Sequence, residues 1–180
     1  VPFETAHVRD ASSITIDTTT VAGTDSVTIS SASNGHNNAA LTITTGAEGG
    51  DQIIVNGTAT FSGTTTLNAS TIHLNANVTN AVTESSATTV NVAAPGQIQD
   101  GINVAASGAT VNVGAGTYIE DILVNKTLVL DGAGVGVSTI SGAIGGDVAT
   151  VRITGNDVEV RDFTITREGN NVGQWNDPGL

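Results

Sequence analysis

The stretch that decides the fold runs from Ala94 to Gly142 and reads APGQIQDGINVAASGATVNVGAGTYIEDILVNKTLVLDGAGVGVSTISG. Its apolar residues change period part-way along. Ile98, Ile102 and Ala105 recur at spacings of four and three, which places them on one face of a short helix. Further along, apolar and polar residues alternate, which is the period of β-strands; the alternating pairs are Val111 and Val113, Ile122 and Val124, and Leu128 and Leu130. The stretch therefore predicts a helix at residues 97–106 that acts as a structural cap on the strands that follow.

The composition predicts an all-β protein with a core of small aliphatic side chains. Aromatic residues make up 3% of the 180 residues, and Met and Cys are absent, so burial depends on Val, Ile, Leu and Ala. The β-branched members of this set favour strands, whereas the many Gly, Thr, Ser and Asn residues favour turns and exposed strand faces.

The first half of the chain predicts a series of short strands. Alternating runs begin at Ser13, Ser26, Ala40, Gln52, Thr64, Ser70 and Thr88, and turn signals such as Asn56-Gly57 separate them. No exact repeat is visible among them. We divide the chain into residues 1–93, a Thr- and Ser-rich β region that forms either a β-helix or a sandwich, and residues 94–180, which contain the helix and the first coils of a solenoid.

The second half predicts a coil of nearly constant length. Corresponding strand residues recur at almost equal separations along the chain. The matched pairs are Val111 with Ile140, Ile122 with Val151, and Leu128 with Val158. Three short strands and their turns fill a coil of this length. Because a parallel β-helix returns to its start through turns, it needs none of the repeated helices that an open parallel sheet requires.

The residues around the helix carry a resemblance to a known group of proteins. The segment VAAPGQIQDGINVAASGATVNVGAGTYIEDILVNKTLVLDGAGVGVSTISG resembles the opening of bacterial right-handed parallel β-helix proteins of the pectin-lyase-like superfamily. In these proteins an amphipathic helix covers the first coil and a Gly-Thr-Tyr segment, here beginning at Gly116, leads into a strand. The segment TATFSGTTTLNASTIHLNANVTN resembles the repeats of large secreted adhesins. The resemblance implies a β-helix fold, but the superfamily includes lyases, hydrolases, epimerases and non-catalytic surface proteins, so it fixes no activity.

The charge of the chain limits its partners. The formal net charge is −12, from 17 acidic and 5 basic residues, and no Lys or Arg lies between Arg9 and Lys126. Such a surface cannot neutralise phosphates, so nucleic acid is excluded as a partner, and no segment is long and apolar enough for membrane insertion. The lack of Cys fits either a reducing compartment or a bacterial surface protein that does without disulfides. The Thr-, Ser- and Asn-rich, Lys-poor composition favours the second, so we predict a secreted or cell-surface protein of a bacterium.

One segment gathers charged residues that could do chemistry. It is NDVEVRDFTITRE, from Asn156 to Glu168. Carboxylate clusters serve as general acid and base or as calcium ligands in polysaccharide-active enzymes. Strand alternation instead places Glu159 and Arg161 on a solvated face, where they pair weakly. We favour this second interpretation and predict no catalytic residue in the chain.

Two further residues are candidates for ligand binding. Asp51 follows Gly49-Gly50 and is a candidate calcium ligand, although a plain turn before a strand explains the single copy of this pattern better. Calcium is therefore the one cofactor with any support. Trp175, the only Trp, could stack on a sugar or pack over the last coil. The three His residues lack the spacing of a zinc site.

These observations predict an extracellular structural or adhesive β-helix segment of a larger protein, without catalysis. Two alternatives stay open: the front portion of a polysaccharide lyase, hydrolase or epimerase, and a subunit of an end-to-end fibre. In each case we expect the open end near Leu180 to be covered by the rest of a longer chain or by another subunit, with glycans as further candidate partners.

Overall fold

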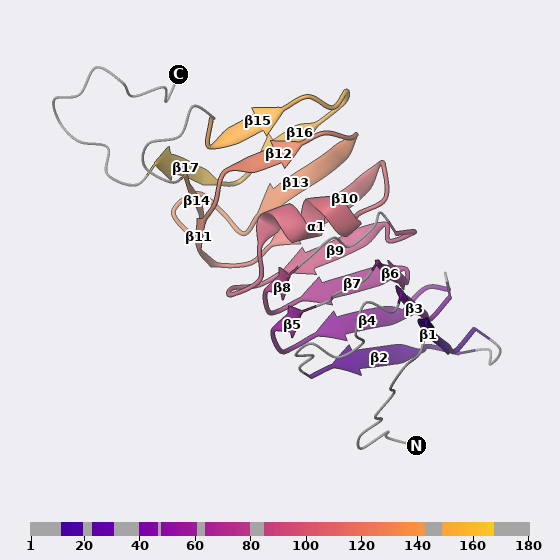
Figure 1. The fold of residues 1–180 in the computed structure, drawn as a ribbon. Helices are drawn as coiled ribbons and strands as arrows, with labels where there is room; N and C mark the ends of the chain where they lie inside the picture. Colours follow the sequence, from indigo (N-terminus) through magenta and orange to yellow (C-terminus); the bar gives the residue numbers. More distant parts are fainter. Residues whose placement is uncertain are drawn as a thin grey trace, which may run out of the picture.

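The chain folds into stacked parallel β-strands with an α-helix beside the middle of the stack (Figure 1). The computed structural model describes residues 12–19, 23–30, 40–46, 48–60, 64–79, 85–142 and 149–167. In these ranges the elements are β1 (Ser13–Asp17), β2 (Ser26–Ile29), β3 (Ala40–Thr44), β4 (Gln52–Val55), β5 (Ala59–Thr60), β6 (Thr65–Asn68), β7 (Thr71–Leu74), β8 (Val78–Thr79), β9 (Thr89–Val92), α1 (Ile98–Val104), β10 (Ala109–Val113), β11 (Gly116–Ile119), β12 (Ile122–Val124), β13 (Leu128–Gly132), β14 (Ser138–Gly142), β15 (Val151–Ile153), β16 (Glu159–Arg161) and β17 (Thr164–Arg167). All-β architecture, as predicted, is confirmed.

Every pair of described strands is parallel, and among these pairs only β9 and β10 are consecutive strands, with α1 between them. The longest sheet, which we call sheet B, has the order β16-β13-β10-β9-β7-β4-β2. The smaller sheets are β1-β3-β6, β11-β14-β17, β12-β15 and β5-β8. Partners in sheet B come from well-separated parts of the chain, as Thr71 and Thr89 do, or Val129 and Glu159. This pairing is compatible with the predicted β-helix.

Sheet B runs without a break across residue 93. β9 pairs with β7 on one side and with β10 on the other, so strands from before and after the helix share one hydrogen-bonded ladder. Beneath the ladder lies one hydrophobic cluster that extends from Ile43 to Ile140 and consists almost entirely of Ile, Val, Leu and Ala. The aliphatic core expected from the composition is therefore continuous through the stack.

The register of the second half differs from the predicted constant coil. Ile122 pairs with Val151, as predicted, but Val111 pairs with Leu130 and not with Ile140, which pairs with Tyr118. The reason is that the connections between successive strands of sheet B are unequal, because the chain from Val111 to Leu130 is much shorter than the chain from Leu130 to Val160. Turn length varies freely as long as each strand returns to its place in the sheet.

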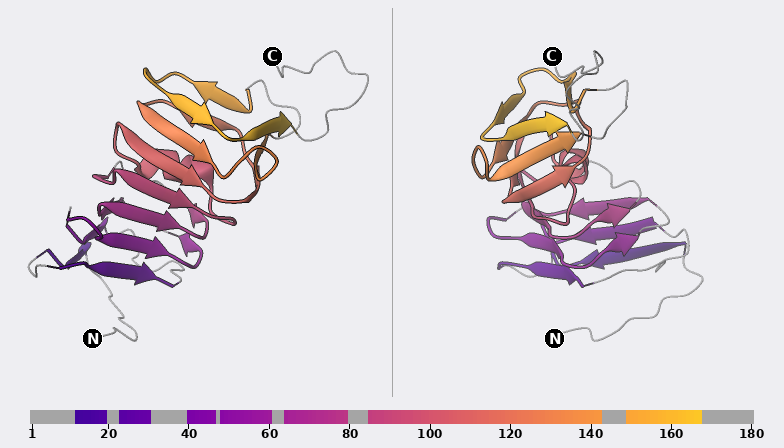
Figure 2. Two further views of the ribbon diagram at one scale, coloured as in Figure 1. Left: turned by 180° about the vertical axis from the view of Figure 1, so that it is seen from behind. Right: turned by 90° about the vertical axis from the view of Figure 1, so that its left-hand side faces the viewer.

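The helix lies against the inner side of sheet B, where it contacts β9 and β10 (Figure 2). It covers Ile98–Val104, inside the predicted 97–106, and the three residues predicted to form the cap, Ile98, Ile102 and Ala105, are all fully buried. Strands of sheet B continue on both sides of it. The close fit depends on Gly101, where an added Cβ would lie 2.6 Å from Cγ2 of Val92.

Residues 120–126, which we call the strap, hold the helix from outside. At the N-terminus the carboxylate of Glu120 accepts hydrogen bonds from the backbone N–H groups of Ile98, at 2.7 Å, and Gln99, at 3.0 Å. At the C-terminus Lys126 Nζ donates to the carbonyl of Ala105 at 2.9 Å. The negative and positive charges thus lie at the helix ends that favour them. The side chain of Gln97 makes no capping hydrogen bond, so Glu120, distant in sequence, supplies the acceptor for the first N–H groups of the helix.

The helix also takes the place of a strand between β8 and β12. The side-chain amide of Gln99 donates to the carbonyl of Leu123 at 3.3 Å and accepts from its N–H at 2.7 Å, as a neighbouring strand would. On the other side, Asp100 accepts from the N–H of Val78 at 3.3 Å. These side chains satisfy strand-edge backbone groups that a helix cannot reach with its own backbone.

We expect Gly101→Ala to lower the free energy of unfolding by about 1–3 kcal/mol, because the new methyl group overpacks Val92 and Val111. This would outweigh the gain of about 1 kcal/mol in helix propensity. Urea unfolding measures the change. Asn103→Ala, at an exposed position of the same helix, is the matched control; it removes only an exposed hydrogen bond from Gln99 and should cost less than about 0.5 kcal/mol. Equal stability of the two variants would contradict the close fit.

We expect Glu120→Ala to lower the free energy of unfolding by about 2–4 kcal/mol, since it leaves the N–H groups of Ile98 and Gln99 without their acceptor. Glu120→Gln keeps one acceptor oxygen and should cost less. Thermal unfolding, with Glu159→Ala as a control at an exposed carboxylate, separates the effects. A loss no larger than that of the control would show that the strap does not hold the helix.

Candidate functional site

The outer face of sheet B carries a row of polar side chains in register. His73 pairs with Asn91, Asn91 with Asn112, Asn112 with Asp131, and Asp131 with Arg161. We call these five residues the polar row. The first three stand between two inward-facing aliphatic residues, so strand alternation turns them outward, and Asp131 and Arg161 continue the row by register. The row therefore follows the axis of the stack on the side away from the helix.

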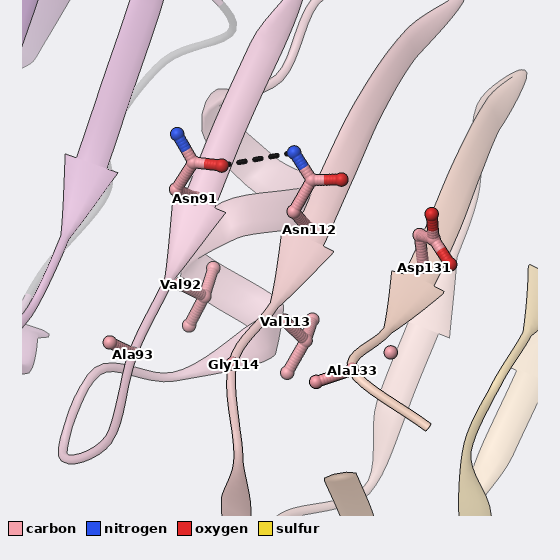
Figure 3. Close-up of a pocket in the computed structure, with 9 residues that line it drawn as sticks. Asn91, Val92, Ala93, Asn112, Val113, Gly114, Asp131 and Ala133 are labelled. Atoms are coloured by element: carbon pink, nitrogen blue, oxygen red, sulfur yellow. Dashed lines mark hydrogen bonds between the residues drawn. The ribbon is translucent and has the colours of Figure 1, made fainter. Parts of the chain in front are cut away.

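Hydrogen bonds link the members of the polar row. Asn112 Nδ2 donates to Asn91 Oδ1 at 2.9 Å (Figure 3), and Asn91 Nδ2 lies 3.5 Å from Nδ1 of His73. At the other end Arg161 donates to Asp131 Oδ2 at 2.8 Å. Among the described residues no donor reaches Asn112 Oδ1 or Asp131 Oδ1. These two oxygens are thus adjacent acceptors directed to solvent on neighbouring strands.

A shallow hollow of about 390 Å³ adjoins the centre of the row. It lies where β9, β10 and β13 end, and its lining repeats one pattern on each strand: a polar row member, an aliphatic or glycine position, and a small residue. The small residues are Ala93, Gly114 and Ala133, which leave the floor open beside the amides (Figure 3). The hollow therefore presents amide and carboxylate groups above an apolar surface.

The row carries little net charge. The hydrogen bond from Arg161 lowers the pKa of the Asp131 carboxyl below its usual value, so both groups are ionised and offset each other at neutral pH. Partial burial lowers the pKa of His73, which keeps its imidazole neutral at pH 7. A row of neutral amides and one internal ion pair suits a neutral hydrogen-bonding ligand better than an ion.

The carboxylates predicted to cluster in the last strands do not converge on one point. Glu159 pairs with Arg161 at 3.1 Å, as predicted, and both side chains are exposed. Asp157 and Asp162, with φ of 50° and 60°, occupy left-handed turn positions on either side of β16. Glu168 lies outside the described residues. Between 12 and 167, the described ranges hold no group of three or more His, Cys, Asp or Glu side chains able to bind a metal ion.

Asp51, the candidate calcium ligand, is almost completely buried and joins two turns. Its Oδ1 accepts from the N–H of Asp25 at 2.9 Å, and its Oδ2 accepts from the N–H of Glu48 at 3.0 Å. Its own carbonyl accepts from the hydroxyl of Ser70 at 2.7 Å. The carboxylate thus has a role in turn structure; calcium binding there stays a prediction.

The strap and helix hold the two carboxyls whose protonation is most displaced by burial. Burial raises the pKa of Asp100 to about 6 and also raises that of Glu120, and the proximity of Glu120 adds to the effect at Asp100. Raised carboxyl pKa values are common in catalytic sites. Here both carboxylates bind backbone N–H groups of the core, so their arrangement serves the fold.

Several predicted residues lie outside the part of the chain that the structure describes. They are Trp175, the candidate sugar platform, and Leu180, the position of the expected open end, together with His7 and His36. The third His residue, His73, lies in the polar row.

Sequence reasoning missed the polar row although a signal was present. The tetrapeptide Thr-Val-Asn-Val occurs twice, at Thr89–Val92 and at residues 110–113, and the two copies are adjacent strands in perfect register. Repeats of four residues escape a search for long periods. An identical short strand that recurs about 20 residues later is nonetheless typical of stacked parallel strands.

Comparisons of the chain with models of protein families, with curated proteins and with solved structures gave no match. The described part of the chain contains no helix long and apolar enough to cross a membrane. The geometry of sheet B is therefore the main basis for a functional proposal.

We expect Asp100→Asn to raise stability at neutral pH by about 1 kcal/mol and to leave it nearly unchanged at pH 4. The pKa of Asp100 is about 6 in the folded chain against 3.8 in the unfolded one, so the folded state binds its proton more tightly. The protonated Asp100 carboxyl therefore stabilises the folded chain. This contribution to the unfolding free energy is complete below pH 3.8 and is lost as the pH rises through 6. The full shift corresponds to about 3 kcal/mol, which partial exposure reduces.

The measurement is the difference in unfolding free energy between Asp100→Asn and the unaltered chain from pH 4 to pH 8. The asparagine keeps an acceptor for the N–H of Val78, so the substitution removes the charge and little else. A difference that does not change with pH would show that Asp100 titrates as an ordinary carboxyl.

Proposed function

We propose that the chain is a right-handed parallel β-helix of pectin-lyase-like type that serves as a non-catalytic, adhesive structural module, and that its polar row binds an extended neutral polysaccharide. The observation that carries the proposal is the register of Asn91, Asn112 and Asp131 on neighbouring strands. The parallel ladder of sheet B supports a β-helix. The right hand of this helix rests on the rule that crossover connections between parallel strands of one sheet are almost always right-handed.

The spacing of the row supports an extended sugar chain as ligand. Neighbouring strands are about 4.8 Å apart, which is close to the length of one pyranose residue in an extended chain. Each successive sugar ring could therefore meet one amide or carboxylate. The adjacent free acceptors, Asn112 Oδ1 and Asp131 Oδ1, suit hydroxyl donors, and the apolar floor at Ala93 and Ala133 suits the carbon face of a ring.

The energetics predict weak binding. A net hydrogen bond contributes about 0.5–1.5 kcal/mol, so three or four of them support a dissociation constant of about 1 mM. The described part of sheet B offers no aromatic platform to strengthen it. Such an affinity suits adhesion to a polymer that presents many equivalent sites, where avidity replaces single-site strength.

The absence of catalysis is part of the proposal, and the partners of four of the described carboxylates support it. Asp51, Asp100 and Glu120 bind backbone N–H groups, whereas Asp121 pairs with Arg167 at 3.2 Å. Hydrolysis or lysis requires a carboxyl or another base that is free to exchange a proton with substrate. The Thr-, Ser- and Asn-rich, Lys-poor composition supports a place outside a bacterial cell.

Affinity gel electrophoresis tests the proposal. We expect migration of the chain to be retarded by a soluble neutral β-1,4-linked polysaccharide such as hydroxyethylcellulose, and not by anionic polygalacturonate. Asn112→Ala should abolish the retardation, because it removes the central amide and breaks the link to Asn91.

The matched control is Asn103→Ala, which removes an exposed amide from the helix on the other side of the core. It should leave the retardation intact. Equal retardation of both variants would refute binding at the polar row, and cleavage of the polymer during the experiment would refute the non-catalytic assignment.

A further inference from the structure

The last described strands leave the hydrophobic column open at one end of the stack. Ile153 of β15 pairs with the fully buried Val124, yet it is 50% exposed. Ile165 of β17 pairs with the fully buried Ile140 and is 51% exposed. Both positions are inward-facing by their register, so they are exposed because no described strand lies above them (Figure 2).

The first described strands leave the opposite end open in the same way. Ile16 of β1 pairs with the buried Ile43 and is 40% exposed. In sheet B, Val27 of β2 is half-buried, whereas its partner Ile53 is fully buried. β2 and β16 are the two edge strands of sheet B, and each has one side without a described hydrogen-bonded neighbour.

One unbroken inward column connects these two edges. Its members occupy the same register position on all seven strands of sheet B and are all aliphatic: Val27, Ile53, Ile72, Val90, Val111, Leu130 and Val160. A β2 strand placed beside β16 in this register would set Val27 next to Val160 and Thr28 next to Arg161. β2 of one copy could therefore pack beside β16 of another copy in the same way as neighbouring strands pack within sheet B.

Charge distinguishes the two ends. Arg152, Arg161 and Arg167 lie on β15, β16 and β17, one on each of the last described strands. The sequence contains no Lys or Arg from residue 10 to residue 125, and the first strands carry Asp17 and the nearby Asp25. The last strands and their turns also carry Asp157, Glu159 and Asp162, so the charges of the last end balance, whereas the first end is acidic. Two first ends therefore repel each other, and a first end meets no excess of like charge at a last end.

We propose that chains associate head to tail, with β2 of a second copy added beside β16 as the next parallel strand of sheet B. The apolar residues at Ile153 and Ile165 of one copy then meet Ile16 and Val27 of the other. Such a contact joins two different surfaces and does not close on itself, so it generates linear assemblies. Each added copy also contributes one more polar row, which would raise avidity without a new site.

One exposed arginine on the last strands, Arg152, gives this contact its direction. Among the described residues Arg152 has no hydrogen-bond or ion-pair partner; it is exposed on the outer face of β15, the last strand of its sheet. Charged side chains on an edge strand oppose indiscriminate pairing. The positive charge of Arg152 would favour the acidic first end of a second copy, which carries Asp17 and Asp25, over another last end.

Two differently blocked variants test the polarity. Ile165→Asp blocks the last end and Ile16→Asp blocks the first end, both at exposed positions where folding should survive, which far-UV circular dichroism checks. We expect the unaltered 17.9 kDa chain to show a mass that rises continuously with concentration in sedimentation velocity. Each variant alone should be monomeric, and an equimolar mixture should form dimers and nothing larger.

Val135→Asp, at a 75% exposed position between β13 and β14, is the matched control and should assemble like the unaltered chain. Arg152→Glu should raise the apparent dissociation constant at least tenfold, and added salt should weaken association of the unaltered chain. Homodimers of either blocked variant, or a strictly monomeric unaltered chain at every concentration, would overturn the proposal. Neither outcome bears on the polar row, which is read by polysaccharide retardation.

Discussion

Parallel pairing between distant strands is the constraint on which the rest of this structure depends. Each strand of sheet B takes its hydrogen-bond partners from segments well removed from it along the chain. Because the pairing is in register, side chains at equal positions form rows along the stack, aliphatic on the inner face and polar on the outer one. The hydrophobic core, the row from His73 to Arg161 and the two open ends all follow from this single alignment.

The helix is accommodated by charged and amide side chains that imitate a sheet. A helix offers no backbone groups at its side, so a strand beside it would lose partners. Gln99 and Asp100 supply the missing donor and acceptors, and Glu120 and Lys126 satisfy the two helix ends. Burial of these carboxylates carries an electrostatic cost, visible in the raised pKa of Asp100 and Glu120. The carboxylates of Asp100 and Glu120, whose raised pKa values are typical of catalytic groups, thus accept hydrogen bonds from backbone N–H groups of the core.

The sequence predicted the elements better than their partners. Alternating runs located most strands, and the spacing of Ile98 and Ile102 located the helix, because both patterns report burial within one element. The two-residue strands β5 and β8 were missed, since two residues cannot show a period. The partner of Val111 was predicted wrongly because the lengths of the turns vary. An alternating burial pattern identifies a strand but does not indicate which other strand pairs with it. The polar row was missed for the same reason: Asn91, Asn112 and Asp131 become neighbours only through register.

The position of the helix also has a mechanical meaning. Of the sheets formed by the described strands, sheet B alone passes the level of α1, while the other four end on one side of it or the other. Tension along the stack would therefore be carried at that level by the β9–β10 ladder and by a few side-chain hydrogen bonds, and elsewhere by several backbone ladders in parallel. A stack built in this way would yield first beside its helix, so extension under load would begin at a defined place and leave the strands on either side intact.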